Sequence, residues 1–191
     1  EDVLCGKRFR LSPGSFYQIN SVQTEKLYNK AIKYADLKKK ETVIDAYCGI
    51  GTIGLIAASK AKEVIGVEIV EEAVTAAKEN AEANGLTNCG FLAGDVLKVI
   101  DEIEEKPDFI VLDPPREGIH PKALPKIVDL CRCEKMLYIS CKPTSLARDL
   151  VEFAKYGYRV EKVCCVDMFP GTVHCETVVL LSKGEVDSKK I

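Results

Sequence analysis

The sequence predicts an α/β fold in which helices cover a mostly parallel sheet that ends in an antiparallel pair of strands. Strand-length apolar runs rich in Val, Ile and Leu alternate with stretches of helical period, as in parallel βα units. After Gly157 two apolar runs follow each other with only a short turn region between them, which indicates an antiparallel pair. With 191 residues, of which 47% are hydrophobic, the chain is long enough to bury the core of such a sheet.

The individual elements are predicted from caps, stops and buried runs. Asn20, with Gln23 three residues later, is expected to cap a first helix that ends near Ala35. Gly85 and Gly157 are expected to stop two later helices. The predicted strands cover residues 42–47, 63–69, 90–93, 109–112, 136–140, 159–167 and 177–182. The predicted connecting helices cover residues 52–59, 72–83, 96–103, 121–131 and 145–155.

The bulk composition argues against several classes of protein. No apolar run has membrane-spanning length, and the N-terminus lacks an export signal. The nine cysteines are an odd number and include no Cys-x-x-Cys pair, which argues against a disulfide framework and against a zinc or iron–sulfur site. We therefore predict a cytoplasmic protein without a metal. The net charge of −2 counts mildly against a self-sufficient RNA-binding module.

A glycine-rich loop follows the first strand of the predicted parallel sheet, over residues 45–52. Its glycines let the backbone approach a ligand closely. Glu68, at the end of the second strand, can accept from both hydroxyls of a ribose, and Asp95, after the third strand, from an adenine amino group. Gly49-x-Gly51-x-x-Gly54 also matches the dinucleotide fingerprint, which leaves a nicotinamide-dependent oxidoreductase as an alternative.

The strand-end segment Asp113-Pro114-Pro115-Arg116 favours a different cofactor. A nicotinamide enzyme has no specific use for Asp-Pro-Pro, whereas the loop and this segment together look like the S-adenosylmethionine site of a Rossmann-like class I methyltransferase. Methyltransferases that act on exocyclic amino groups carry an aromatic residue where this chain has Arg116. The segment therefore argues against amine methylation.

Cys141 is the candidate nucleophile because it lies between a strand and a helix start. A pyrimidine C5 attacks a methyl donor only after a thiolate has added to C6, and a base must then remove the C5 proton. The following helix, with Pro143 early in it, is expected to lower the pKa of the Cys141 thiol. Cys48 also precedes a helix, but it lies in the cofactor loop. Glu176 is the candidate base, with His174 as its rival.

These motifs together resemble the RNA uracil-5-methyltransferase family, which makes 5-methyluridine in 23S ribosomal RNA and in the T-loop of transfer RNA. The resemblance runs from Phe9 through Leu181. The matching segments are Phe16-x-Gln18-x-Asn20, residues 45–51, residues 113–118, residues 140–149 and residues 167–176. Two residues depart from the family pattern, because Lys142 and Thr52 stand where the family commonly has asparagine.

The resemblance implies roles for individual residues and for the chain. Cys141 would be the nucleophile and Glu176 the proton acceptor, acting on uridine in RNA, with 23S ribosomal RNA favoured over transfer RNA. The residues implied for the S-adenosylmethionine and substrate pocket are Gln18, Tyr47, Thr52, Glu68, Asp95 and Asp113. We expect a lead-in segment and helix (1–40), a catalytic domain (41–183) and a flexible tail (184–191). Family members usually carry an N-terminal oligonucleotide-binding barrel, and some an iron–sulfur cluster, so we expect this chain to be a fragment. A non-enzymatic RNA-binding module is the third alternative.

Overall fold

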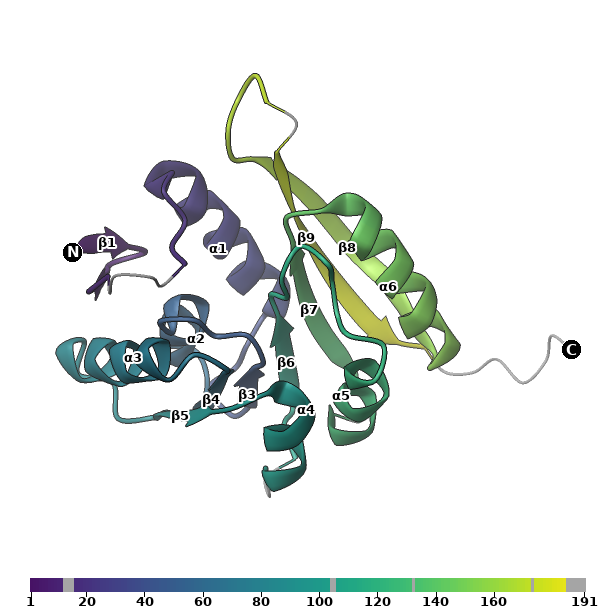
Figure 1. Cartoon of the computed structure of the whole chain (residues 1–191), viewed down its shortest axis with the longest axis horizontal. Coiled ribbons are helices and arrows are strands. Elements are labelled where there is room, and N and C mark those ends of the chain that lie inside the picture. Colours follow the sequence, from purple (N-terminus) through teal and green to yellow (C-terminus); the bar gives the residue numbers. More distant parts are fainter. Residues whose placement is uncertain (12–15, 104–105, 132, 173, 185–191) are drawn as a thin grey trace, which may run out of the picture.

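A seven-stranded sheet with helices on both faces forms the centre of the molecule, in the order β5-β4-β3-β6-β7-β9-β8 (Figure 1). The computed structural model describes residues 1–11, 16–103, 106–131, 133–172 and 174–184. The strands are β1 (Asp2–Leu4), β2 (Lys7–Phe9), β3 (Thr42–Asp45), β4 (Glu63–Glu68), β5 (Cys89–Ala93), β6 (Phe109–Leu112), β7 (Lys135–Ser140), β8 (Tyr158–Asp167) and β9 (Cys175–Lys183). The helices are α1 (Ser21–Ala35), α2 (Thr52–Ala58), α3 (Glu71–Ala83), α4 (Val96–Val99), η1 (Ile100–Glu102), α5 (Ala123–Cys131) and α6 (Pro143–Lys155).

The pairing of the strands confirms the predicted fold class. Strands β3, β4, β5, β6 and β7 pair in parallel, whereas β9 runs antiparallel to both of its neighbours, β7 and β8. The ends of each predicted strand agree with the observed ends to within about two residues, because turn-forming residues separate the apolar runs. The insertion of β9 beside β7 matters for function, because Ser140 pairs with Thr177. The end of β7 and the start of β9 therefore meet at one edge of the sheet.

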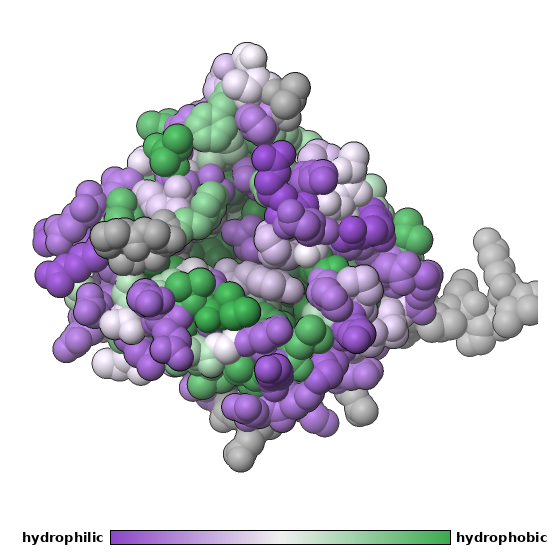
Figure 2. Space-filling model, viewed as in Figure 1, coloured by the Kyte–Doolittle hydropathy of each residue, from purple (hydrophilic) through white to green (hydrophobic). Residues whose placement is uncertain are grey.

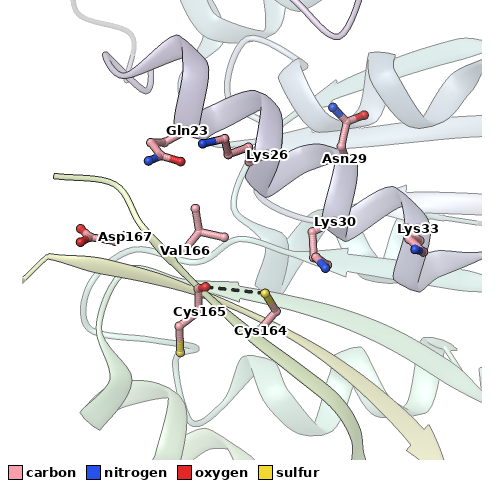
Figure 3. A pocket seen from close by; sticks show the side chains of 9 residues that line it. All are labelled: Gln23, Lys26, Asn29, Lys30, Lys33, Cys164, Cys165, Val166 and Asp167. Atoms are coloured by element: carbon pink, nitrogen blue, oxygen red, sulfur yellow. Dashed lines mark hydrogen bonds between the residues drawn. The ribbon is translucent and has the colours of Figure 1, made fainter. Parts of the chain in front are cut away.

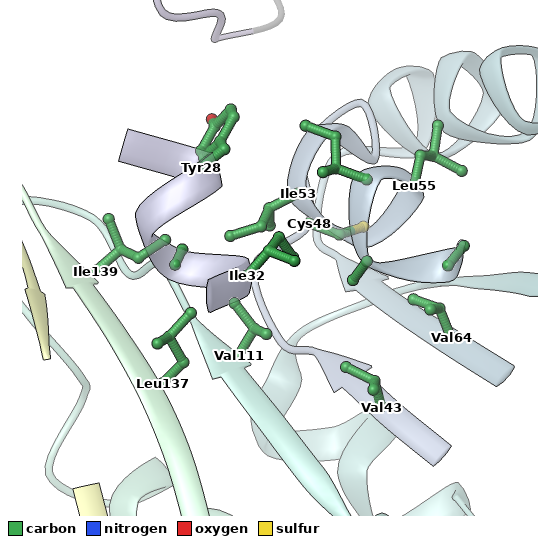
Figure 4. Close-up of a cluster of buried hydrophobic side chains, with 14 of the residues drawn as sticks. Tyr28, Ile32, Val43, Cys48, Ile53, Leu55, Val64, Val111, Leu137 and Ile139 are labelled. Carbon is green, nitrogen blue, oxygen red and sulfur yellow. The ribbon is translucent and has the colours of Figure 1, made fainter. Parts of the chain in front are cut away.

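Alternate residues of the central strands enter two separate cores, as required of a sheet that is covered on both faces. Val43 packs into the core under α1, α2 and α3, and its neighbour Ile44 packs into the core under α4, α5 and α6. In the first core, Tyr28 and Ile32 of α1 lie over Leu137 and Val111, as Figure 4 shows. Helix α1 is thereby fixed on the sheet beside the strands that carry the candidate site.

The N-terminal part of the chain shows one predicted and one unpredicted feature. Asn20 caps α1 as expected, since its Oδ1 accepts from the backbone N of Gln23 at 3.2 Å. Strands β1 and β2, however, form a hairpin that the sequence analysis missed. Cys5 and Gly6 form its two-residue turn, with φ of +50° and +74°. Gly6 in this turn is the only sequence signal that would have indicated the hairpin.

Two further predictions concern the ends and the surface of the molecule. The predicted helix over 96–103 consists of a short α4 followed by the 3₁₀ turn η1. The predicted flexible tail covers residues 184–191. Gly184 is described, and the other seven, 185–191, lie outside the described residues. None of the helices that the structure describes has the length and apolarity needed to cross a bilayer.

Candidate active site

The candidate residues gather at the edge where the parallel strands end. Asp45 is the last residue of β3, Glu68 is the last residue of β4, and Asp113 and Cys141 directly follow β6 and β7. In an open parallel sheet this edge is the place where ligands bind. The space-filling view shows the molecule hollowed near the middle of this face, between α1 and α6 (Figure 2).

The loop between β3 and α2 forms a close cradle at this edge. Gly49 and Gly51 have φ of +54° and +84°, a backbone conformation that residues with a Cβ rarely adopt. A Cβ on Gly51 would also lie 3.2 Å from Ala77 and Phe91. The Cys48 side chain is buried in the core below the loop, and burial raises its pKa well above the usual value. Cys48 therefore points away from the ligand side of the loop.

The two side chains predicted to bind the ribose and the adenine, Glu68 and Asp95, are held in place by hydrogen bonds from nearby backbone N–H groups. The two carboxylate oxygens of Glu68 accept from the backbone N of Gly49 and of Val70, both at 3.0 Å. Oδ1 of Asp95 accepts from the backbone N of Leu97 at 2.9 Å. These contacts leave further lone pairs on each carboxylate, so both side chains retain acceptors for a ligand hydroxyl or amino group.

Two further residues predicted for the cofactor pocket lie in this loop and at the start of the helix that follows it. Tyr47 is half-buried, and burial together with the charge of Asp95 raises its pKa to about 12. Thr52 is the first residue of α2 and is half-buried.

Three acidic side chains with raised pKa values lie together below the cradle. Burial raises the pKa of Asp45 to about 7, although the backbone N–H groups of Gly54 and Tyr47 act in the opposite direction. Burial and the charges of Glu176 and Asp45 raise the pKa of Asp113. Burial raises the pKa of Glu176, which is 7% exposed. Repelling carboxyls of this kind fit a cationic ligand, and S-adenosylmethionine carries a sulfonium and an ammonium group.

Cys141 lies in a turn that its neighbours hold in place. The hydroxyl of Ser140 donates to the carbonyl of Lys142 at 3.1 Å and accepts from its backbone N at 3.2 Å. Pro143 is at the first turn of α6 as predicted, and Lys142 is the N-cap residue without a side-chain capping bond. The thiol is thus fixed between the end of β7 and the start of α6.

The expectation that α6 lowers the pKa of the Cys141 thiol is wrong for the protein without ligands. The pKa of this half-buried thiol is raised, first by burial and then by the negative charges of Glu176 and Asp113. Arg116 offsets only part of this effect. The net effect is upward because burial and the two negative charges together exceed the contributions that lower the pKa.

The candidate base Glu176 faces the same site from β9. Gln18 donates from Nε2 to Oε1 of Glu176 at 3.4 Å, so the predicted cofactor-side residue Gln18 contacts the candidate base. The rival base His174 is exposed. Val166 of β8 pairs with Glu176 from the other side. The geometry therefore gives Glu176, rather than His174, a position beside the strand end that carries Cys141.

A polar network behind Cys141 was missed by the sequence analysis. Asp149 of α6 is 2% exposed, and its Oδ2 accepts from the Tyr138 hydroxyl at 2.7 Å and from the backbone N of Ile119 at 2.8 Å. Arg148 bonds Oδ1 of Asp149 and donates to the carbonyl of Glu117 at 2.6 Å. The network fastens α6 to the loop that follows Asp113 at the end of β6.

One more hydrogen bond and a closely packed glycine complete this connection. Ser145 donates to the carbonyl of Arg116 at 2.7 Å. Gly118 has φ +82°, and a Cβ there would lie 2.4 Å from Oδ2 of Asp149. The Arg-Asp pair at 148–149 was visible in the sequence, but its partners on another loop were not.

Comparison with known proteins identifies the family. The sheet and its glycine loop are those of a Rossmann-like α/β protein. Residues 37–169 match the methyltransferase-domain family, and this chain belongs to that family.

The chain is similar to longer relatives. One is an uncharacterized RNA methyltransferase of Clostridium acetobutylicum, 52% identical over 176 residues, a match covering 92% of this chain and 38% of that protein. Another, from Caldanaerobacter subterraneus, is also named an uncharacterized RNA methyltransferase. It is 52% identical over 183 residues, covering 96% of this chain and 40% of the relative. The chain thus spans about two fifths of the length of these curated relatives.

Solved structures share the fold. The tRNA (uracil-54, C5)-methyltransferase of Pyrococcus abyssi, solved in complex with S-adenosyl-L-homocysteine, matches with a TM-score of 0.81 and 28% identity, covering 94% of this chain and 43% of that one. The tRNA m1G37 methyltransferase of M. jannaschii matches with a TM-score of 0.75 and 15% identity. The match covers 96% of this chain and 56% of that one. The second similarity concerns the fold alone, and it shows that this architecture serves more than one methylation chemistry.

Proposed function

We propose that this chain is the catalytic part of an S-adenosylmethionine-dependent RNA methyltransferase that methylates C5 of uridine. The observation that carries the proposal is the register of β7 and β9, which brings the thiol of Cys141 and the carboxyl of Glu176 to one edge of the sheet. A reactive cysteine and a base beside a cofactor loop are the groups that C5 methylation requires. We assign the reaction to residues 41–183, with the segment 1–40 supplying Gln18.

The cofactor assignment rests on the cradle and the buried carboxyls. Glu68 and Asp95 would take the ribose and the adenine, and the glycine loop would lie along the amino-acid part. When it is bound, S-adenosylmethionine supplies an electrophilic methyl group on a sulfonium. Membership of the methyltransferase-domain family does not favour the nicotinamide-dependent oxidoreductase.

Cys141 and Glu176 divide the chemistry on the uridine between them. The Cys141 thiolate forms a bond to C6, and the electron pair moves to C5 and O4, so that C5 can accept the methyl group. Glu176 then takes the proton from C5, the C5–C6 double bond forms again, and the C6–sulfur bond breaks to release the thiolate. The raised pKa of Glu176 makes it a stronger base than an ordinary carboxylate, as removal of the C5 proton requires.

The target uridine must expose C6 to the thiol, so we propose that it is taken from a loop or flipped out of a helix. Ribosomal RNA remains our favoured substrate. The similar Pyrococcus protein is a transfer RNA enzyme, which makes transfer RNA the comparison that the experiment needs.

The test is nucleoside mass spectrometry of unmodified 23S ribosomal and transfer RNA transcripts after incubation with the protein and S-adenosylmethionine. We expect 5-methyluridine with the wild type, and none with Cys141→Ala. Cys89→Ala is the matched control, because Cys89 is also half-buried but begins β5 at the opposite edge of the sheet. A methylated nucleoside other than 5-methyluridine would refute the uracil-C5 assignment, and full activity of Cys141→Ala would refute the mechanism.

A further inference from the structure

A groove outside the candidate active site runs between α1 and β8. It has a volume of about 560 Å³ and is lined on the helix side by lysines and amides and on the strand side by residues 164–167. Figure 3 shows the side chains of Lys26, Lys30 and Lys33 along one stretch of α1, beside the strand. At about 1.5 Å per residue, Lys26 and Lys33 lie about 10 Å apart along the helix axis.

The charge of this groove is strongly unbalanced toward the positive. Its lining includes three lysines and a single carboxylate, that of Asp167. Within the described part of the chain, none of these lysines lies within ion-pair distance of an acidic side chain. Lysines without an ion-pair partner along a groove are available for an anionic ligand.

Aromatic contact orders the positive charges at one end of the groove. The ammonium groups of Lys30 and Lys162 lie 5.8 Å and 5.7 Å from the centre of the Tyr34 ring. Cation–π contacts at this distance restrict long side chains that would otherwise move freely in solvent. The Tyr34 hydroxyl is itself fixed, since it donates to the carbonyl of Val163 at 3.3 Å. The helix and the strand therefore present their lysines in a defined arrangement.

The other end of the groove reaches the segment that carries the candidate base. Val166, which lines the groove, pairs with Glu176. Asn20, the cap of α1, donates from Nδ2 to the carbonyl of Met168 at 2.7 Å, and Gln18 contacts Glu176. A strand of nucleic acid that leaves the candidate site along β8 would meet the lysines next.

We propose that the groove between α1 and β8 binds the phosphate backbone of the substrate RNA on one side of the target uridine. This inference rests on the proposed function. Lysines contact phosphates as point charges and bind without reading sequence, and a basic groove is the usual track for a single strand. The groove thus supplies affinity to a chain whose overall net charge of −2 would not attract RNA.

The test compares two variants of equal charge. The groove variant carries Lys26→Gln, Lys30→Gln and Lys33→Gln. The control variant carries Lys60→Gln, Lys62→Gln and Lys106→Gln, three exposed lysines near the starts of β4 and β6, at the opposite edge of the sheet. Binding of a fluorescein-labelled oligouridylate is measured by anisotropy in the presence of S-adenosylhomocysteine, from about 50 to about 200 mM KCl.

We expect the groove variant to bind RNA at least about tenfold more weakly than the wild type at the lower salt concentration. Its salt slope should be smaller by about 2, since three single-strand phosphate contacts are lost. The control variant should keep the wild-type slope. Equal RNA affinity in all three proteins, or an equal loss in both variants, would overturn the proposal. Unchanged RNA affinity with lost binding of polyglutamate would assign the groove to an acidic protein instead. Because no turnover is measured, these outcomes are independent of whether uridine C5 is the methylated atom.

Discussion

At the scale of single residues, the protonation of Cys141 is the central problem of the proposed chemistry. The nucleophile must be a thiolate, yet burial and two neighbouring carboxyls raise the pKa of this thiol. The same carboxyls attract cations. A bound ligand with a positive charge near Asp113 and Glu176 would offset their repulsion and make the thiolate easier to form. In the proposed mechanism, activation of Cys141 therefore depends on the charge of the bound cofactor.

This dependence predicts the alkylation behaviour of Cys141. Without ligand, the rate of its reaction with iodoacetamide should rise with pH around a midpoint above 9.0, because the thiol pKa is raised. Sinefungin, which has an ammonium group in place of the sulfonium, should lower that midpoint more than the uncharged thioether of S-adenosylhomocysteine. Peptide mass spectrometry separates Cys141 from the other cysteines. Identical midpoints with the two ligands would contradict the electrostatic explanation.

Removal of the Glu176 charge gives a second prediction at the same scale. Glu176→Gln keeps the shape of the side chain but removes the base and one source of repulsion on Cys141. The alkylation midpoint of Cys141 should fall, whereas turnover should be lost and the covalent RNA adduct should accumulate. Denaturing gel electrophoresis with labelled RNA measures the adduct. An unchanged turnover rate would remove Glu176 from the proposed role.

At the scale of elements, the network around Asp149 joins the helix after Cys141, the proposed nucleophile, to the loop after Asp113. Its carboxylate takes up hydrogen bonds from β7, from the loop and from Arg148, and each of these is charge-assisted. Because the carboxylate is buried, the loss of one partner would leave a costly unpaired group. The two loops that frame the candidate site should therefore move as one unit.

Gly118 gives a controlled test of this connection. Gly118→Ala and Gly157→Ala both place a side chain at positive φ, which costs about 1–2 kcal/mol. Only the first also brings a Cβ to 2.4 Å from Asp149, whereas Gly157 has open space around it. Gly118→Ala should lose about 1–3 kcal/mol more in urea unfolding and should trap RNA more slowly. Equal losses of stability and unchanged trapping would show that the two loops are independent.

The elements also show how far the sequence could predict the structure. The caps and stops at Asn20, Gly85 and Gly157 and the buried runs predicted most strands and helices, since these signals are local. The hairpin of β1 and β2 was missed because three-residue strands carry too little periodicity. The Asp149 network and the groove were missed because their partners come from distant segments. The pKa of Cys141 was predicted in the wrong direction for the same reason, since Glu176 approaches it only through sheet pairing.

At the scale of the whole molecule, the buried carboxyls should make stability fall as pH rises. A carboxyl with a pKa of about 3.8 in the unfolded chain and about 7 in the fold binds more protons when folded, between those two values. Rising pH therefore favours the unfolded state across that range. Asp45 is fully buried, so the effect is not screened by solvent.

The Asp45→Asn variant measures this contribution by difference. The unfolding free energy of the wild type, relative to that of the variant, should decrease by at most about 4 kcal/mol between pH 4 and pH 7. Urea unfolding at a series of pH values gives both curves. A difference that stays constant, or that grows with pH, would show that Asp45 is ionised in the folded protein.

The most direct measurement of the central claim is mass spectrometry of the protein after incubation with S-adenosylmethionine and RNA containing 5-fluorouridine. Fluorine at C5 cannot leave as a proton, so the last step is blocked. We expect a stable complex in which the peptide containing Cys141 carries a methylated 5-fluorouridine nucleotide. Attachment at another cysteine, or methyl transfer to the RNA with no covalent complex, would contradict the central claim.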